Sequence, residues 1–125
     1  MKKIAMITLV FSGVLFAQSV QDIINANGCL GCHAVASKKL APAFAGIAKR
    51  NKRMNGSAAK VTVMNSIKNG SHGKYPMFSN SSMPPFPNIS KKDLSILADY
   101  ILAQSSKAQC CAGKGQGMGM GRGMR

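Results

Sequence analysis

The chain has 125 residues, a formal net charge of +14, and 17 Lys and Arg residues against 3 acidic ones. This length fits one small domain, and so small a core usually needs support from a disulfide, a metal or a cofactor. The positive charge favours an acidic protein or an anionic membrane surface as partner. Nucleic acid is not expected, because no aromatic residues are interleaved with the basic ones.

The first residues, 1–17, have the organisation of a secretory signal peptide. Two lysines precede an apolar run at 4–16, and small residues follow it. The run is shorter than the roughly 20 residues of a membrane span, although an uncleaved anchor is the alternative. We expect cleavage after Ala17, with Ser19 as the other position, and export to the periplasm.

A first short helix is predicted over 20–32, and its end carries the pattern Cys29-Leu30-Gly31-Cys32-His33. C-x-x-C-H is typical of c-type haem attachment. Thiols at positions i and i+3 lie on one face of a helical turn, so Cys29 and Cys32 can join one porphyrin edge. His33 then brings an imidazole nitrogen to the iron.

Two helices are predicted in the middle of the chain. After a loop at 34–44, a basic helix over 45–54 is expected to turn its Lys and Arg side chains, Arg50 among them, toward water. Another helix begins near residue 57 and ends at Gly70. The segment 70–89 is rich in Gly, Pro, Ser and Asn, and it is predicted to be a long functional loop without strands.

The last helix is predicted over 90–104. Ser90 is the expected N-cap, Asp93 completes a capping box, and Leu94, Leu97 and Ile101 fall on one apolar face. The domain at 18–106 is therefore predicted to be all-α, with a flexible cationic tail at 107–125. Two alternatives for the tail are a disulfide and a Cu(I) site with thioether ligands. The residues concerned are Cys110 and Cys111 for the disulfide, and Met118, Met120 and Met124 for copper.

A haem iron with one imidazole ligand either takes a second ligand or stays open to small molecules. Met83 is the favoured second ligand, because the prolines at 84 and 85 fix φ and stiffen the backbone that would hold it. Met77 and His72, in the same loop, are the alternatives. Met54 and Met64 lie on predicted helices and are expected to be core or surface residues.

The chain resembles the short bacterial branch of the monohaem class I cytochromes c. The matching motifs are GCLGCH at 28–33, APAF at 41–44, IKNGSHG at 67–73, MPPFP at 83–87 and DLSILADYILAQ at 93–104. The resemblance implies about four helices wrapped around one covalently bound haem c. It also implies that the first and last helices cross near Ile23, Ile24, Leu97 and Tyr100.

The same resemblance implies roles for individual residues. Cys29 and Cys32 would form the thioether bonds, with His33 as proximal and Met83 as distal ligand. The carbonyl of Pro42 would accept a hydrogen bond from His33, which orients the ring and raises its basicity. Tyr75 falls where the family often has a Trp near a haem propionate.

The expected function is a periplasmic electron carrier, a monomer and not an enzyme, that cycles between Fe(III) and Fe(II). Its partners would be acidic or membrane-bound redox proteins of a respiratory chain, with peripheral membrane contact as a further option. Exposed lysines would surround the haem edge and make docking weak and salt-sensitive. These lysines are Lys38, Lys39, Lys68 and Lys74.

Two other classes of function stay open. A labile Met83 would leave the iron accessible to peroxide or nitric oxide, as in an enzyme or a sensor. Without haem, Cys29 and Cys32 could serve thiol redox chemistry, which needs a thioredoxin-type sheet, or bind zinc together with Cys110 and Cys111.

Overall fold

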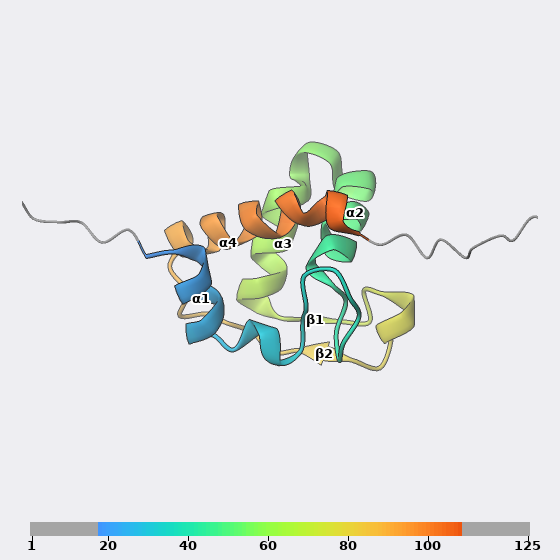
Figure 1. Cartoon of the computed structure of the whole chain (residues 1–125), viewed down its shortest axis with the longest axis horizontal. Helices are drawn as coiled ribbons and strands as arrows, with labels where there is room; N and C mark the ends of the chain where they lie inside the picture. The colour runs from blue at the N-terminus through green and yellow to red at the C-terminus, as the bar shows by residue number, and fades with distance from the viewer. Residues whose placement is uncertain (1–17, 109–125) are drawn as a thin grey trace, which may run out of the picture.

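The computed structural model describes residues 18–108 (Figure 1). The predicted signal peptide at 1–17 and the tail from residue 109 onward, with its Cys and Met residues, lie outside the described residues. Four α-helices form the framework of the described structure: α1 (Val20–Ala26), α2 (Phe44–Asn55), α3 (Ala59–Asn69) and α4 (Lys91–Ala103). None of the helices within 18–108 has both the length and the apolar character needed to cross a membrane.

Helix α1 is shorter than the sequence predicted. It begins with a capping box, in which Ser19 Oγ accepts a hydrogen bond from the N–H of Asp22 and the Asp22 carboxylate accepts one from the N–H of Ser19. The predicted continuation to residue 32 is wrong. Gly28 has φ +63°, which a glycine adopts readily, and the chain then forms a separate 3₁₀ helix, Cys29–Gly31.

The helices α2 and α3 form where the sequence predicted them. Gly56, with φ +48°, ends α2, and Gly70, with φ +76°, ends α3. One side chain of α2 contradicts its prediction: Arg50 is only partly exposed, and its guanidinium carbon lies 5.3 Å from the centre of the Tyr75 ring. Arg50 thus caps an aromatic face instead of pointing freely into water.

The segment 70–89 contains structure that the sequence did not predict. Two short antiparallel strands, β1 (Ser71–His72) and β2 (Ser82–Met83), pair Ser71 with Met83 and His72 with Ser82. Between them lies a 3₁₀ helix, Pro76–Phe78. The prediction of a loop without strands is therefore wrong, because residues 71–72 pair with residues 82–83 across the intervening stretch 73–81.

The last helix, α4, runs across the molecule and packs against the other three helices (Figure 1). Ser90 caps it by accepting from the N–H of Asp93 and donating its hydroxyl to the Asp93 carboxylate. A 3₁₀ helix, Gln104–Lys107, continues it. On its surface, Lys60 of α3 and Asp99 form an ion pair with a distance of 2.7 Å between Nζ and Oδ2.

The apolar core lies where α1, α3 and α4 meet around the first turn of α2. The buried residues of this core are Ile23, Ile24, Phe44, Val63, Ile67, Leu94, Leu97, Ala98 and Ile101. The predicted crossing of the first and last helices is present, with Ile23, Ile24 and Leu97 among the most completely buried side chains. The core also forms one wall of a cavity.

Candidate functional site

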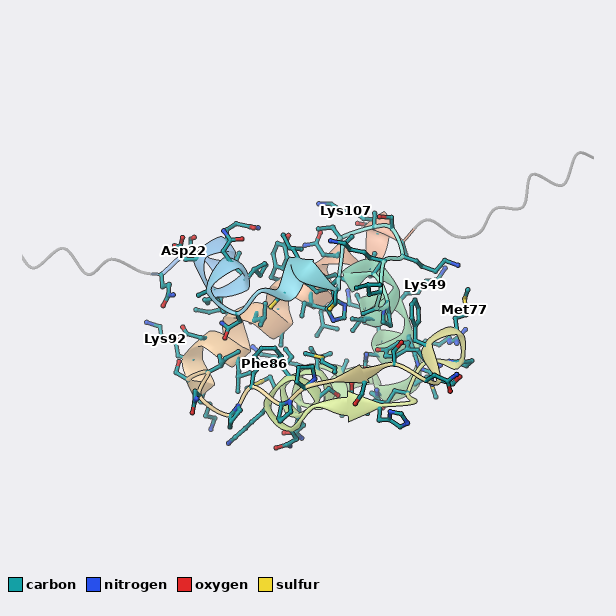
Figure 2. The ribbon with its side chains drawn as sticks, turned by 90° about the horizontal axis from the view of Figure 1, so that it is seen from below. Asp22, Lys49, Met77, Phe86, Lys92 and Lys107 are labelled. Atoms are coloured by element: carbon teal, nitrogen blue, oxygen red, sulfur yellow. The ribbon has the colours of Figure 1, made fainter. Side chains whose placement is uncertain are left out.

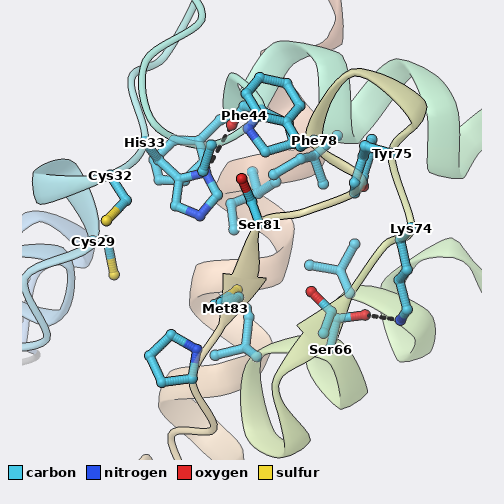
Figure 3. Close-up of a pocket in the computed structure, with 18 of the residues that line it drawn as sticks. Cys29, Cys32, His33, Phe44, Ser66, Lys74, Tyr75, Phe78, Ser81 and Met83 are labelled. Atoms are coloured by element: carbon cyan, nitrogen blue, oxygen red, sulfur yellow. Dashed lines mark hydrogen bonds between the residues drawn. The ribbon is translucent and has the colours of Figure 1, made fainter.

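A cavity of about 530 Å³ opens between the Cys29–His33 turn, the helices α2, α3 and α4, and the segment that carries β1 and β2. Its size is typical of sites for small molecules and cofactors. Most of its wall is apolar and includes Phe44, Val63, Phe86 and Leu97. Figure 3 shows side chains from these separate parts of the chain converging on one space.

The two cysteines lie at one edge of this cavity (Figure 3). The short 3₁₀ turn that holds them is closed by hydrogen bonds from the N–H groups of Cys32 and His33 to the carbonyl of Cys29. Both thiols are free, Cys29 partly buried and Cys32 exposed. Burial raises the pKa of the Cys29 thiol, while a backbone hydrogen bond lowers it to a smaller extent. Both thiols line the cavity and can react with a ligand bound there. The raised pKa of Cys29 favours its neutral thiol form.

The imidazole of His33 is fixed in one orientation. It is 8% exposed, and its Nδ1 lies 2.7 Å from the carbonyl oxygen of Pro42. A carbonyl only accepts, so Nδ1–H donates, and Nε2 is the ring nitrogen left to bind a metal. Phe44 stacks beside the ring at 5.3 Å between centres and an interplanar angle of 24°. The hydrogen bond expected between His33 and Pro42 is present.

Met83 lies on β2, on the other side of the cavity from His33 (Figure 3). It is partly buried and packs against the core. The other ligand candidates in this segment lie elsewhere: Met77 is 71% exposed and points outward at the edge of the molecule (Figure 2), and His72 is exposed. Within 18–108, no second histidine and no other methionine lines the cavity.

Tyr75 forms part of a polar wall that the sequence analysis identified only in part. Its hydroxyl accepts a hydrogen bond of 3.3 Å from Nδ2 of the buried Asn51, whose Oδ1 accepts one of 2.9 Å from Asn55. Arg50 covers the Tyr75 ring. Burial raises the pKa of Tyr75, against smaller lowering contributions from Asn51 and the charge of Arg50. Asn51 and Arg50 were missed because their helical spacing alone does not distinguish them from solvated residues.

The predicted lysines fall into two groups. Lys74 lines the cavity and donates to Ser66 Oγ at 2.6 Å, while Lys39 donates to the carbonyl of Leu30 at 2.8 Å. Lys38 is exposed beside Met77, with 3.9 Å between its Nζ and the Met77 Sδ. Lys68 instead lines a separate hollow between α3 and α4. Three of the four lysines thus lie near the cavity or the turn at its edge.

The residues of this cavity fit a covalently bound haem. The space is large and mostly apolar, two thiols stand at one edge, and an imidazole and a thioether line opposite sides. Within the described part of the chain, no three His, Cys, Asp or Glu side chains cluster in a way that would hold a metal ion. The thioredoxin-type sheet that a thiol redox enzyme needs is not the fold observed here. A helical fold with this donor set defines the class of c-type haem proteins.

Comparison with known proteins identifies the family. Residues 17–105 match the cytochrome c family. Cytochrome c-551 of Stutzerimonas stutzeri is 32% identical over 108 residues, which cover 82% of this chain and 98% of the relative. Cytochrome c-552 of Nitrosomonas europaea is 34% identical over 87 residues, which cover 70% and 80%.

The fold agrees with a solved structure of that second relative. The crystal structure of wild-type Nitrosomonas europaea cytochrome c552 superposes with a TM-score of 0.58 at 33% identity and covers 67% of this chain and 98% of that one. The chain therefore belongs to the cytochrome c family, as a monohaem class I member similar to the bacterial cytochromes c-551 and c-552. The predicted family, the mostly helical fold, and the general assignment to haem and electron transport are confirmed.

Proposed function

We propose that this protein is a periplasmic one-electron carrier, whose haem c is joined to Cys29 and Cys32 and ligated by His33 and Met83. When bound, the haem supplies reversible one-electron chemistry at its iron. The observation that carries the proposal is the pairing of two donors across one cavity. His33 has its Nε2 left free by the Pro42 hydrogen bond, and Met83 lines the opposite side.

The residues around these donors support electron transfer in three ways. The Pro42 carbonyl holds His33 as a donor of fixed tautomer, and Phe44 restricts rotation of its ring. The apolar wall excludes water from the ligands, which helps to set the reduction potential. Met83 would be the second protein ligand of the iron, which would leave no site there for a substrate.

The ligation is tested by an absorption spectrum, a pyridine haemochrome assay, and two methionine variants. Met83→Ala is expected to abolish the weak long-wavelength band that ferric haem with a thioether ligand displays, and to lower the reduction potential. Met77→Ala is the matched control, because Met77 belongs to the same segment but is 71% exposed. If Met77→Ala removed the band and Met83→Ala did not, Met83 would not be the ligand. Rapid binding of carbon monoxide to the native ferrous protein would support the enzyme or sensor alternative instead.

We further propose that partners dock at the edge of the cavity. Leu40, which lines the cavity, is 68% exposed, and Met77 is 71% exposed. Lys38 and Lys74 lie in the same region of the molecule. An apolar contact with positive charges around it suits a weak, fast encounter with an acidic redox protein.

Charge-reversal variants test this docking surface. With hexacyanoferrate as an anionic redox probe, Lys38→Glu and Lys74→Glu are expected to slow electron exchange, and the difference should shrink as salt is added. Lys92→Glu is the control, since Lys92 is exposed at the start of α4, far from Met77 (Figure 2). Equal slowing by all three variants would show that only net charge matters.

A further inference from the structure

Gly70 makes an unusually close backbone contact with the segment that carries Met83. It follows the last residue of α3 and has φ +76° and ψ 173°, a conformation that residues with a side chain rarely adopt. A Cβ at this position would lie 2.6 Å from the carbonyl oxygen of Met83, 3.1 Å from the nitrogen of Pro85 and 3.2 Å from the carbonyl carbon of Pro84. All three are backbone atoms, so no change of rotamer could relieve the contact.

Two further contacts hold the segment from Met83 to Phe86 in place. At its start, Met83 pairs with Ser71 in the β1–β2 ladder. After it, the N–H of Phe86 donates to the carbonyl of Ile67 in α3 at 3.0 Å, and the Phe86 side chain packs against the core. Between these anchors, two prolines restrict φ. The segment therefore has little freedom to yield if it is pushed away from α3.

We propose that Gly70 is a positioning residue for Met83. Because Gly70 has no side chain, the end of α3 lies directly against Met83, Pro84 and Pro85 and holds the thioether on the side of the cavity opposite His33. This inference rests on the proposed function, in which Met83 is the iron ligand. A side chain at position 70 would displace the backbone of Met83 and raise the fraction of molecules in which Met83 has left the iron.

The experiment compares two glycine-to-alanine variants of the holoprotein. Gly70→Ala adds both backbone strain and the close contact. Gly56→Ala is the matched control: Gly56 also has a positive φ, +48°, and follows a helix, but a Cβ there meets nothing within 4 Å. Both variants are expected to lose stability through the strained backbone, so thermal denaturation alone would not separate them.

The separating measurement is the affinity of the ferric protein for imidazole. Imidazole must displace Met83, so its apparent affinity rises in proportion to the fraction of open molecules. Gly70→Ala is expected to raise that affinity about tenfold, to weaken the thioether absorption band and to lower the reduction potential. Gly56→Ala is expected to stay within about twofold of the wild type.

Two results would overturn the inference, and they are distinguishable. If Gly70→Ala and Gly56→Ala bound imidazole equally well, Gly70 would have only a structural role, and the proposed function would stand. If Met83→Ala changed neither the band nor the imidazole affinity, the ligation itself would be wrong, and the role of Gly70 would be refuted with it.

A milder variant covers the case in which Gly70→Ala yields no holoprotein. Phe86→Ala keeps Gly70 and the hydrogen bond to Ile67 but removes the packing that anchors the same segment. It is expected to raise the imidazole affinity about threefold. An unchanged affinity in Phe86→Ala would overturn the proposal that the contacts of this segment hold Met83 in place.

Discussion

Replacing Tyr75 with Phe removes one hydroxyl from the polar wall of the cavity. The hydrogen bond that is lost, from Asn51 Nδ2, is long at 3.3 Å, and the same amide nitrogen also donates to the carbonyl of Ile47 at 2.9 Å. A weak bond of this kind contributes about 0.5–1 kcal/mol. The phenylalanine ring retains an aromatic face for Arg50. We therefore expect Tyr75→Phe to lower the free energy of unfolding at neutral pH by about 0.5–1 kcal/mol.

The pH dependence of this variant is the sharper test. Burial raises the pKa of Tyr75 above its ordinary value of 10.0, so the folded protein holds the phenol proton more tightly than the unfolded chain does. The resulting stabilisation is fully present below about pH 10 and is lost as the pH rises through the folded-state pKa. Tyr75→Phe has no phenol proton to lose. The difference in free energy of unfolding between wild type and variant should therefore shrink, and can reverse, above pH 10.

The assay is guanidinium unfolding of the reduced holoprotein, followed by far-UV circular dichroism, from pH 7 to the alkaline limit of folding. Tyr100→Phe is the control at neutral pH, because its hydroxyl accepts only an exposed hydrogen bond of 3.4 Å from Gln21. At neutral pH, Tyr100→Phe should lower the free energy of unfolding by less than Tyr75→Phe does. Parallel stability curves for wild type and Tyr75→Phe above pH 10 would refute the buried, neutral phenol.

Two further predictions concern stability and processing. Ser19→Ala removes the α1 cap and should lower the free energy of unfolding, measured with denaturant, by about 1 kcal/mol. Because the cap needs Ser19, N-terminal sequencing of the exported protein should begin at Gln18. A start at Val20 would contradict this. Leu97→Ala truncates a side chain that is 1% exposed and should cost about 2–5 kcal/mol, whereas the less buried Leu102→Ala should cost less. Equal losses at the two leucines would refute the assignment of the core.

The features that could be predicted from sequence depend on neighbours along the chain. The C-x-x-C-H pattern that brings Cys29, Cys32 and His33 together is local, although its turn is a 3₁₀ helix and not the predicted end of α1. Ser90 and the periodic apolar residues after it predicted α4. The polar pairing of His33 with Pro42 was expected only through resemblance to a family. Its geometry depends on how a loop folds back over nine residues.

The features that sequence reasoning missed depend on contacts between distant residues. The early end of α1 was encoded in Gly28, but a glycine inside a helical pattern does not by itself reveal its φ. The β1–β2 pair adjoins the close approach of Gly70 to Met83, and the place of Arg50 depends on a ring that is 25 residues away in sequence. Neither the periodicity nor the composition of a segment contains that information.

Each of the three acidic side chains of this protein makes a hydrogen bond or an ion pair within the fold. Asp22 and Asp93 cap helices, and Asp99 pairs with Lys60. These three carboxylates stand against 17 Lys and Arg residues in the whole sequence, so the chain keeps a formal net charge of +14. Two copies that meet in dilute buffer should repel each other, so self-association is opposed before any contact forms. At the proposed docking surface, the same positive charge would favour a partner that brings negative charge.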